Sequence, residues 1–351
     1  MRRLGIALVG LSVVASILSG PSGSSVVPSA PLQHAIAAVR TARILSPITR
    51  WVSVGVSTLW VSSGATRSVD RLTTSPPAAV RQWIAAMTVS QKRWLVGKVE
   101  TQVLYGTTVA VITTIAGWTR VVVASQPTLR DTRGYPGWIP TWQLSSHHPT
   151  STSETAVVSS PSTWLFKTVS LAPSSNQVME VSYGTQLPVV KVNPNSVVVV
   201  LLDGRKVYVP RSAVSLRATR SAMKPSHQQV IIEASKFLGL SYLWGGTSGF
   251  AFDCSGFTYS VFRFLGVTIP RDAAPQATKG EPVSRRNLRA GDLVFFRNAS
   301  GAIVHVAIFI GSPGGVPSVI HSPDTGLTIM ITPLSAWTNA SFAGARRYIQ
   351  R

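Results

Sequence analysis

The sequence YLWGGTSGFAFDCSGFTYSVFRFLG, residues 242–266, decides the fold of the C-terminal part of the chain. It holds the single cysteine, Cys254. The apolar residues after this cysteine recur at positions that share one face of a helix: Phe257, Val261, Phe264 and Leu265. Because Gly266 suits the end of a helix, the spacing predicts an amphipathic helix that begins at Cys254.

The start of a helix is a suitable place for a nucleophilic cysteine. Unpaired N–H groups and about half a positive charge lie there, which favours a thiolate and can hold an oxyanion. The alternative is that Cys254 is a small buried hydrophobe, which is the commoner role of a lone cysteine. Catalysis by Cys254 would also require a base from elsewhere in the chain.

Two histidines on one predicted β-hairpin can supply that base. His305 lies in the apolar run 303–310, and His321 ends the next run, 318–321. Both are equally far from Pro313 in the turn, so a hairpin that closes there places them opposite, or nearly opposite, each other. A base and the group that orients it need this geometry, whereas a lone histidine on a strand is usually structural.

The segment 225–351 is predicted to be one α+β domain. Ser226 can cap a helix that ends at Gly239 and has this apolar face: Val230, Ala234, Phe237 and Leu238. After the helix at Cys254 come four runs rich in β-forming residues: 293–296, 303–310, 318–321 and 327–331. Helices followed by an antiparallel sheet are typical of the α+β class.

The middle of the chain contains a weak internal repeat. Tyr105-Gly106-Thr107 is echoed by Tyr183-Gly184-Thr185, and Trp138-Ile139-Pro140 by Tyr208-Val209-Pro210. Short β-rich runs surround both copies, which predicts two small all-β barrels, residues 79–147 and 164–217. The intervening segment 148–163 is rich in Ser, Thr and Pro and is predicted to be a linker.

The N-terminal part combines an export signal with a segment that we leave unassigned. Residues 1–30 form a predicted signal peptide, with Arg2 and Arg3 followed by an apolar run too short for a comfortable membrane span. An uncleaved membrane anchor is the alternative. Residues 31–78 are unassigned, and a short amphipathic helix is predicted after Pro76-Pro77 because Val80, Trp83, Ile84 and Met87 recur at helical spacing.

The composition limits the possible partners. Lys and Arg number 33 against 12 Asp and Glu, a net charge of +21, which favours anionic partners. The anionic partners open to such a chain are nucleic acid, anionic lipid and the acidic polymers of a bacterial wall, and the scattered rather than clustered basic residues count against nucleic acid. One cysteine excludes an intramolecular disulfide, so each domain must rely on its hydrophobic core.

Six short motifs follow one another in the C-terminal domain: Trp244-Gly245-Gly246, Asp253-Cys254-Ser255-Gly256, Ile269-Pro270-Arg271, Gly291-Asp292-Leu293-Val294-Phe295-Phe296, His305-Val306-Ala307-Ile308 and Ile320-His321. In this order they resemble the NlpC family of cell-wall cysteine peptidases, which have a papain-like core. The resemblance implies that Cys254 is the nucleophile, His305 the base and His321 the orienting third group. The two predicted barrels similarly resemble bacterial SH3-type modules.

The combination of tandem SH3-type modules with such a domain resembles one branch of the family, which cleaves the bond between γ-D-glutamate and the diamino acid of wall stem peptides. This resemblance implies that Asp253 and Ser255 help bind the amino end and D-glutamate of the peptide, and that Tyr242 lines the same cleft. No metal or cofactor is implied. One departure is Asp272-Ala273-Ala274, where members often carry Ser or Thr.

The sequence therefore predicts a multidomain protein: two small all-β SH3-type barrels followed by an α+β papain-like cysteine peptidase domain. It is expected to be a secreted, wall-associated, monomeric hydrolase of peptidoglycan stem peptides. We expect it to contact anionic wall polymers through its basic surface, and a membrane only if the N-terminal segment is uncleaved. The alternatives are another papain-like amidase or acyltransferase, a non-catalytic wall-binding protein, and a zinc site formed by Cys254, His305 and His321.

Overall fold

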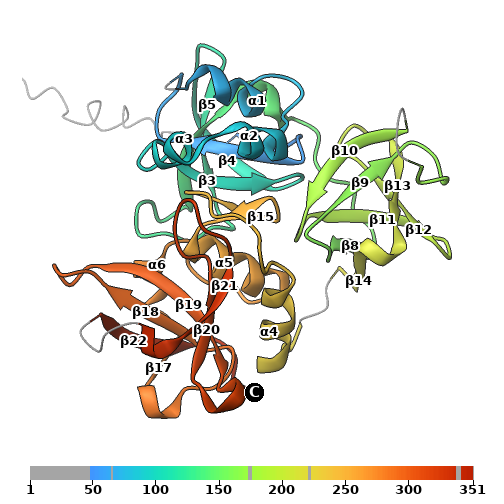
Figure 1. Ribbon diagram of the computed structural model, residues 1–351. Coiled ribbons are helices and arrows are strands. Elements are labelled where there is room, and N and C mark those ends of the chain that lie inside the picture. The colour runs from blue at the N-terminus through green and yellow to red at the C-terminus, as the bar shows by residue number, and fades with distance from the viewer. Residues whose placement is uncertain (1–47, 65, 173–175, 220–222, 337–340, 351) are drawn as a thin grey trace, which may run out of the picture. The chain divides into compact units, whose positions relative to one another are not determined.

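The computed structural model describes residues 48–64, 66–172, 176–219, 223–336 and 341–350 (Figure 1). They fall within one unit of the chain, Pro47–Arg351. The predicted signal peptide and residues 31–47 of the unassigned segment lie outside the described residues. In the part of the chain that is described, no helix is both long and apolar enough to cross a membrane.

Seven antiparallel strands form the first β-domain, in the order β3-β2-β6-β5-β4-β1-β7. Their bounds are β1 Thr49–Val52, β2 Val56–Trp60, β3 Val99–Leu104, β4 Thr108–Ile115, β5 Trp118–Val123, β6 Tyr135–Pro140 and β7 Leu144–Ser145. Short helices accompany them: η2 Ser68–Asp70, α1 Arg71–Thr74, α2 Val80–Ala86, α3 Val89–Arg93 and η3 Thr141–Gln143. The helix predicted after Pro76-Pro77 is α2, and its apolar side chains Val80, Trp83 and Ile84 are buried.

The first β-domain begins earlier than the sequence indicates. Strands β1 and β2 come from the unassigned segment 31–78, so the sheet starts at Thr49 rather than after residue 79. Strand β2 lies between β3 and β6 and is buried along its whole length. Its sequence lacks the alternation of a half-buried strand for that reason, and its partners are far away in the chain.

The second β-domain repeats the strand order of the first, as β10-β9-β13-β12-β11-β8-β14. Tyr-Gly-Thr follows the third strand in both domains, at 105–107 and 183–185, and the sixth strand ends at Pro140 or Pro210. The weak sequence repeat therefore marks equivalent positions in two copies of one topology. The strands are β8 Glu154–Val158, β9 Ser162–Phe166, β10 Gln177–Ser182, β11 Gln186–Val192, β12 Ser196–Val200, β13 Lys206–Pro210 and β14 Val214–Ala218, with η4 Arg211–Ala213 before the last.

Part of the predicted linker is a strand of the second β-domain. Strand β8, Glu154–Val158, falls inside residues 148–163 and pairs with both β11 and β14. Its C-terminal end is buried, while Glu154 at its start is exposed. A Ser- and Thr-rich composition does not distinguish such a strand from a linker, because the pairing that orders it comes from distant residues.

The C-terminal domain contains helices first and a six-stranded antiparallel sheet afterwards, in the order β17-β22-β18-β19-β20-β21. The helices are α4 His227–Ser235, α5 Cys254–Phe264 and α6 Ala273–Gln276, and the hairpin before α5 is β15 Thr247–Ser248 with β16 Ala251–Phe252. The sheet strands are β17 Glu281–Val283, β18 Leu293–Arg297, β19 Ile303–Gly311, β20 Ser318–His321, β21 Met330–Pro333 and β22 Phe342–Arg347. Single turns η5 Arg285–Asn287, η6 Pro313–Gly315 and η7 Leu334–Ala336 complete it.

The local signals of this domain are largely confirmed. Ser226 caps α4, accepting a hydrogen bond from the Gln229 N–H at 3.3 Å. The helix ends at Ser235 rather than at Gly239, so Leu238 lies beyond it and is 47% exposed instead of sharing the buried face. The last predicted strand, 327–331, is displaced to Met330–Pro333. Residues 327–329 bond instead to the segment after α4, where Tyr242 N–H donates to Leu327 O at 3.0 Å.

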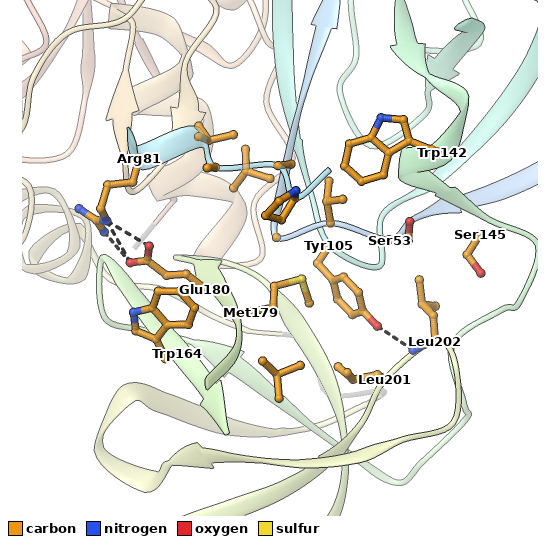
Figure 2. A pocket seen from close by; sticks show the side chains of 18 of the residues that line it. Ser53, Arg81, Tyr105, Trp142, Ser145, Trp164, Met179, Glu180, Leu201 and Leu202 are labelled. Atoms are coloured by element: carbon orange, nitrogen blue, oxygen red, sulfur yellow. Dashed lines mark hydrogen bonds and ion pairs between the residues drawn. The ribbon is translucent and has the colours of Figure 1, made fainter. Parts of the chain in front are cut away.

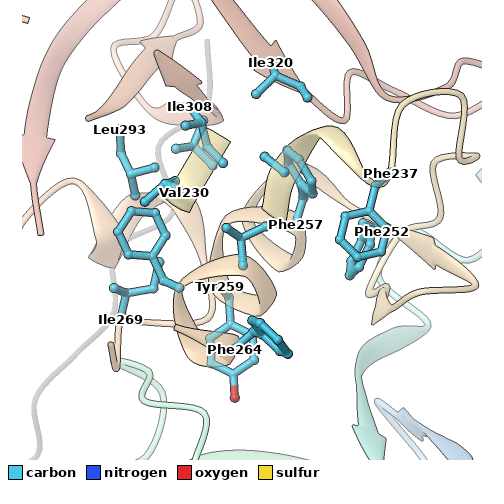
Figure 3. Close-up of a cluster of buried hydrophobic side chains, with 14 of the residues drawn as sticks. Val230, Phe237, Phe252, Phe257, Tyr259, Phe264, Ile269, Leu293, Ile308 and Ile320 are labelled. Atoms are coloured by element: carbon cyan, nitrogen blue, oxygen red, sulfur yellow. The ribbon is translucent and has the colours of Figure 1, made fainter. Parts of the chain in front are cut away.

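Helix α5 is the centre of the domain rather than an amphipathic surface helix. All four residues of its predicted apolar face are buried, but so are Ser255, Thr258 and Ser260 on the other faces. Figure 3 shows Phe257, Tyr259 and Phe264 of this helix within an aromatic and aliphatic cluster that includes Ile308 and Ile320 of the sheet. The opposite side of α5 is also covered, because Tyr259 OH donates to Ser125 O of the first β-domain at 2.9 Å.

Strand β3 joins the first β-domain to the segment that precedes α5 (Figure 1). Trp244 Nε1 donates to Val99 O at 3.0 Å, and Thr247 Oγ1 donates to Gln102 O at 2.8 Å. Ser248 Oγ donates to the side-chain oxygen of the same glutamine at 2.7 Å. The first β-domain therefore packs against residues 244–248, the segment that precedes Cys254 in the chain.

Candidate active site

Cys254 is the first residue of α5, directly after the β15–β16 hairpin. Asp253 is the N-cap and accepts a hydrogen bond from Gly256 N–H at 2.6 Å. Cys254 is 9% exposed, and its sulfur receives hydrogen bonds from the backbone N–H groups of Val306 and Ser255. Because Val306 follows His305 on β19, this contact brings the thiol beside the segment that carries the first histidine.

His305 and His321 form a hydrogen-bonded pair. His305 Nε2 lies 2.9 Å from His321 Nδ1, and the two rings are edge to face with centroids 5.0 Å apart. His321 Nε2 in turn lies 3.0 Å from Thr332 Oγ1 on β21. Thr332 therefore holds the far side of the His321 ring, a role that the sequence analysis did not assign.

The register of the hairpin differs from the predicted one by two residues. Ile308 pairs with Ile320 and Phe309 with Val319, and a bulge before Gly311 shifts the pairing near the turn. Continuing this register, His321 faces Ala307, and His305 is its diagonal neighbour. The rings meet because long side chains on adjacent strands reach across a diagonal.

Burial sets the protonation states of the resting site. It raises the pKa of the Cys254 thiol to about 12, and the nearby Asp253 carboxylate adds to the effect. Burial also lowers the pKa of His321 to about 4, and burial together with His321 lowers the pKa of His305 to about 3. Near neutral pH the site thus holds a neutral thiol and two neutral imidazoles, so burial outweighs the thiolate preference expected from the helix terminus.

Asp253 is held by a buried ion pair. Arg271 Nη2 donates to Asp253 Oδ2 at 2.6 Å, and Arg271 Nη1 donates to Oδ1 at 3.0 Å. Asp253 Oδ2 also accepts the Gly245 N–H at 2.9 Å. Arg271 is 1% exposed, and its Nε donates to Thr101 Oγ1 on β3 at 2.9 Å. The pair therefore connects the residue before Cys254 to the first β-domain.

Ser255 and Tyr242 also lie at this site. Ser255 Oγ donates to Asp253 Oδ1 at 3.2 Å and accepts from Arg271 Nη1 at 3.0 Å. Tyr242 is 6% exposed, and burial, together with the charges of Asp253 and Cys254, raises the pKa of its hydroxyl. Its hydroxyl therefore stays protonated. All six residues named from the sequence thus gather around the start of α5 and the facing ends of β19 and β20.

Arg271 is a residue of the site for which the sequence predicts no role. Its motif, Ile269-Pro270-Arg271, carries only the family resemblance. The sequence does contain a signal for this role. A buried arginine needs a carboxylate partner, and the chain has few acidic residues that could supply one. Asp272, next to it, is partly exposed, with Oδ1 3.8 Å from Arg271 Nη1. Its pKa is raised by burial.

The zinc interpretation requires a cluster of metal-binding side chains. Within the described residues, no group of three or more His, Cys, Asp or Glu side chains is arranged to hold a metal ion. The zinc interpretation of Cys254, His305 and His321 therefore has no ligand cluster to support it here.

Comparison with known proteins identifies the family. The γ-D-glutamyl-L-lysine dipeptidyl-peptidase of Bacillus cereus is 36% identical over 309 residues, which cover 85% of this chain and 90% of the relative. The enzyme of the same name from Bacillus subtilis is 36% identical over 284 residues, which cover 80% of this chain and 92% of the relative. The chain belongs to the NlpC/P60 family. Residues 239–347 match the NlpC/P60 family, and residues 158–216 match the YKFC SH3b2 domain.

The solved structures agree with this assignment. The crystal structure of an NlpC/P60 family protein from Bacillus cereus superposes with a TM-score of 0.78 at 34% identity, covering 86% of this chain and 99% of that one. The protein is thus a cysteine peptidase of the NlpC/P60 family with an SH3b domain, as the sequence predicts. The SH3b match falls on the second β-domain.

Proposed function

We propose that this NlpC/P60 enzyme hydrolyses the bond between γ-D-glutamate and the diamino acid of peptidoglycan stem peptides, with Cys254 as nucleophile. The position of Cys254 at the start of α5, beside the strand that carries His305, supports the chemistry. The name of the relatives in Bacillus cereus and Bacillus subtilis supports the choice of bond. The first β-domain, which repeats the topology of the SH3b-matching second one, is proposed to be SH3-type as well.

The catalytic step is a proton transfer coupled to nucleophilic attack. Because His321 occupies Nε2 of His305, the Nδ1 atom of His305 is the nitrogen proposed to accept the Cys254 proton. The sulfur attacks the γ-glutamyl carbonyl, His305 returns the proton to the leaving amine, and water releases the acyl-enzyme. The pKa of the Cys254 thiol is raised and that of His305 is lowered, so the proton is proposed to move from Cys254 to His305 only as the sulfur attacks.

The backbone at the helix start is proposed to hold the oxyanion. The cap engages Gly256 N–H, and the sulfur engages Ser255 N–H. The Cys254 N–H has no acceptor among the described residues, so it is the donor available to a developing negative charge. Of the N–H groups at the start of α5 that the sequence offers to an oxyanion, we therefore propose that of Cys254 as the donor.

The two histidines are expected to contribute unequally. We expect His305→Ala to lower kcat by roughly a thousandfold or more and His321→Ala to lower it by less, because a base can act in part without its orienting partner. His227→Ala is a matched control, since His227 belongs to the same domain but bonds to Ala290 O. Steady-state kinetics on one peptide checks all three. A His305→Ala enzyme near wild type with an inactive His321→Ala enzyme would reverse the assigned roles.

The substrate is proposed to have a free amino end. Asp253, Arg271 and Asp272 together carry a net charge of −1 when ionised, which suits one ammonium group. Asp253 and Ser255 are proposed to bind this end and D-glutamate, with Tyr242 lining the cleft. A dipeptidyl-peptidase, as the relatives are named, likewise acts from a free amino end.

This proposal is tested with two matched substrates, the peptide L-Ala-γ-D-Glu-diamino acid and the same peptide attached to muramic acid. We expect kcat/KM on the free peptide to be higher by at least roughly tenfold, because a charge-assisted contact contributes about 1.5–3 kcal/mol. Mass spectrometry of the products identifies the bond, with the Cys254→Ala protein as the blank. Equal rates on the two substrates would contradict the proposal and favour an endopeptidase of intact wall.

The location and wall contact of the enzyme are also proposals. We propose that residues 1–30 direct secretion and that the excess of basic residues holds the enzyme on anionic wall polymers. The net charge of +21 supports the second point. Such attraction is screened over about 8 Å at physiological salt, so it acts only near the wall surface.

A further inference from the structure

A cavity separate from the candidate active site lies between the two β-domains. Its volume is about 560 Å³, which falls in the range of small-ligand sites. Both β-domains contribute to its lining, together with Phe250 of the C-terminal domain, and none of the six proposed site residues lines it. The proposed hydrolysis at Cys254 therefore does not account for this cavity.

Two tryptophans flank the cavity, one from each β-domain. Figure 2 shows Trp142 and Trp164 on either side of the lining, with Tyr105 and Met179 between them. The two tryptophans are 37% and 38% exposed. Trp142 Nε1 donates to Thr74 O at 2.8 Å, which fixes the orientation of the indole and leaves its ring available for a ligand.

Apolar side chains line the cavity around the Tyr105 hydroxyl. Met179, Leu201 and Leu202 line it, and Tyr105 is 6% exposed. The Tyr105 hydroxyl accepts the Leu202 N–H at 2.6 Å, and among the described residues no acceptor is present for the hydroxyl hydrogen. A buried donor without a partner costs free energy, so an acceptor supplied by a ligand would stabilise it.

The charges of the cavity wall are already paired. Arg81 binds both carboxylate oxygens of Glu180, at 2.7 and 3.1 Å, and its guanidinium stacks on the Phe250 ring at 4.7 Å. Asp203 and Arg205 pair with each other at 2.7 Å. These pairs leave no net charge for an ionic ligand, so a neutral ligand with apolar faces and a hydrogen-bond acceptor fits best.

We propose that this cavity binds a neutral N-acetylated amino sugar of the wall glycan. A pyranose ring can place its C–H face on an indole, and its acetamide carbonyl can accept from Tyr105 while the acetamide methyl contacts Met179. The site goes beyond hydrolysis: it holds the enzyme on glycan while Cys254 acts on peptide. Because no catalytic residue contributes, loss of sugar binding and loss of hydrolysis are separable.

The test measures binding of the β-1,4-linked tetramer of N-acetylglucosamine to the full protein by isothermal titration calorimetry. Trp142→Ala and Trp164→Ala should each weaken the affinity at least tenfold, and hydrolysis of free stem peptide should be unchanged. Trp94→Ala is the matched control, since Trp94 is 38% exposed but lies outside the cavity against Arg67. Trp164→Phe, which retains an aromatic ring, should restore part of the affinity lost in Trp164→Ala.

Three results would overturn the site. They are no binding of the tetramer at millimolar concentration, an equal loss in Trp94→Ala, and unchanged affinity in both cavity variants. Binding of the free stem peptide in the cavity, in place of the sugar, would also overturn the site. It is measured in a Cys254→Ala background, where Trp142→Ala would then weaken the affinity for the peptide.

Discussion

Replacing Cys254 with alanine is expected to lower the hydrolysis of stem peptides by roughly a thousandfold or more, since the acyl-enzyme can no longer form. The protein should stay folded, because the substitution leaves the Asp253 cap and the Arg271 ion pair in place. Rates measured by mass spectrometry, with circular dichroism as the control for folding, check the prediction. A folded Cys254→Ala protein that keeps a tenth of the activity would refute the nucleophile assignment.

The same cysteine offers an independent chemical test. It is the only cysteine of the chain, so iodoacetamide can modify no other thiol and should inactivate the enzyme, whereas a chelator should not. Because burial raises the thiol pKa to about 12, the thiolate fraction at pH 7 is small and grows as the pH rises. The alkylation rate should therefore increase steadily from pH 7 to 10. A plateau already reached near pH 6 would indicate a preformed thiolate and imidazolium pair.

Replacing Asp253 with asparagine is expected to lower the free energy of unfolding by about 3–5 kcal/mol, because it leaves the buried Arg271 cation without its carboxylate. Asparagine caps a helix as well as aspartate does, so the change isolates the loss of charge. Denaturant unfolding monitored by tryptophan fluorescence measures the effect.

Asp203→Asn provides a matched control for this substitution. Asp203 also pairs with an arginine, Arg205, but both side chains are largely exposed, at 48% and 62%. Its loss should change the free energy of unfolding by less than about 1 kcal/mol. If Asp253→Asn is no more destabilising than Asp203→Asn, Arg271 does not depend on Asp253 for its burial.

This ion pair changes how the specificity of the enzyme can be examined. Asp253 is proposed to bind the substrate ammonium, and its oxygens also accept two Arg271 hydrogen bonds and two backbone N–H groups. An Asp253→Asn enzyme would combine a folding defect with any change in substrate preference. The comparison of free and sugar-linked peptides on the unaltered enzyme avoids that confusion.

The sequence by itself determined the elements with strong local signals. The caps at Ser226 and the spacing of Phe257, Val261 and Phe264 predicted α4 and α5, which the structure confirms. The repeated Tyr-Gly-Thr predicted a tandem repeat, and the two sheets have the same strand order. The motifs around Cys254 and His305 contain residues that the fold brings together. Each motif lies near the start of a helix or strand, where the local sequence determines the backbone.

Only the tertiary structure decided the features that depend on distant partners. Strand β2 is ordered by β3 and β6, and β8 by β11 and β14, so neither carried a readable local pattern. The observed register of the hairpin places Ala307, not His305, opposite His321. Arg271 became part of the site because Asp253 and Thr101, from two domains, meet its guanidinium. A side chain's burial and its ionic partners depend on contacts remote in sequence, and those contacts raise the thiol pKa that the helix start alone would lower.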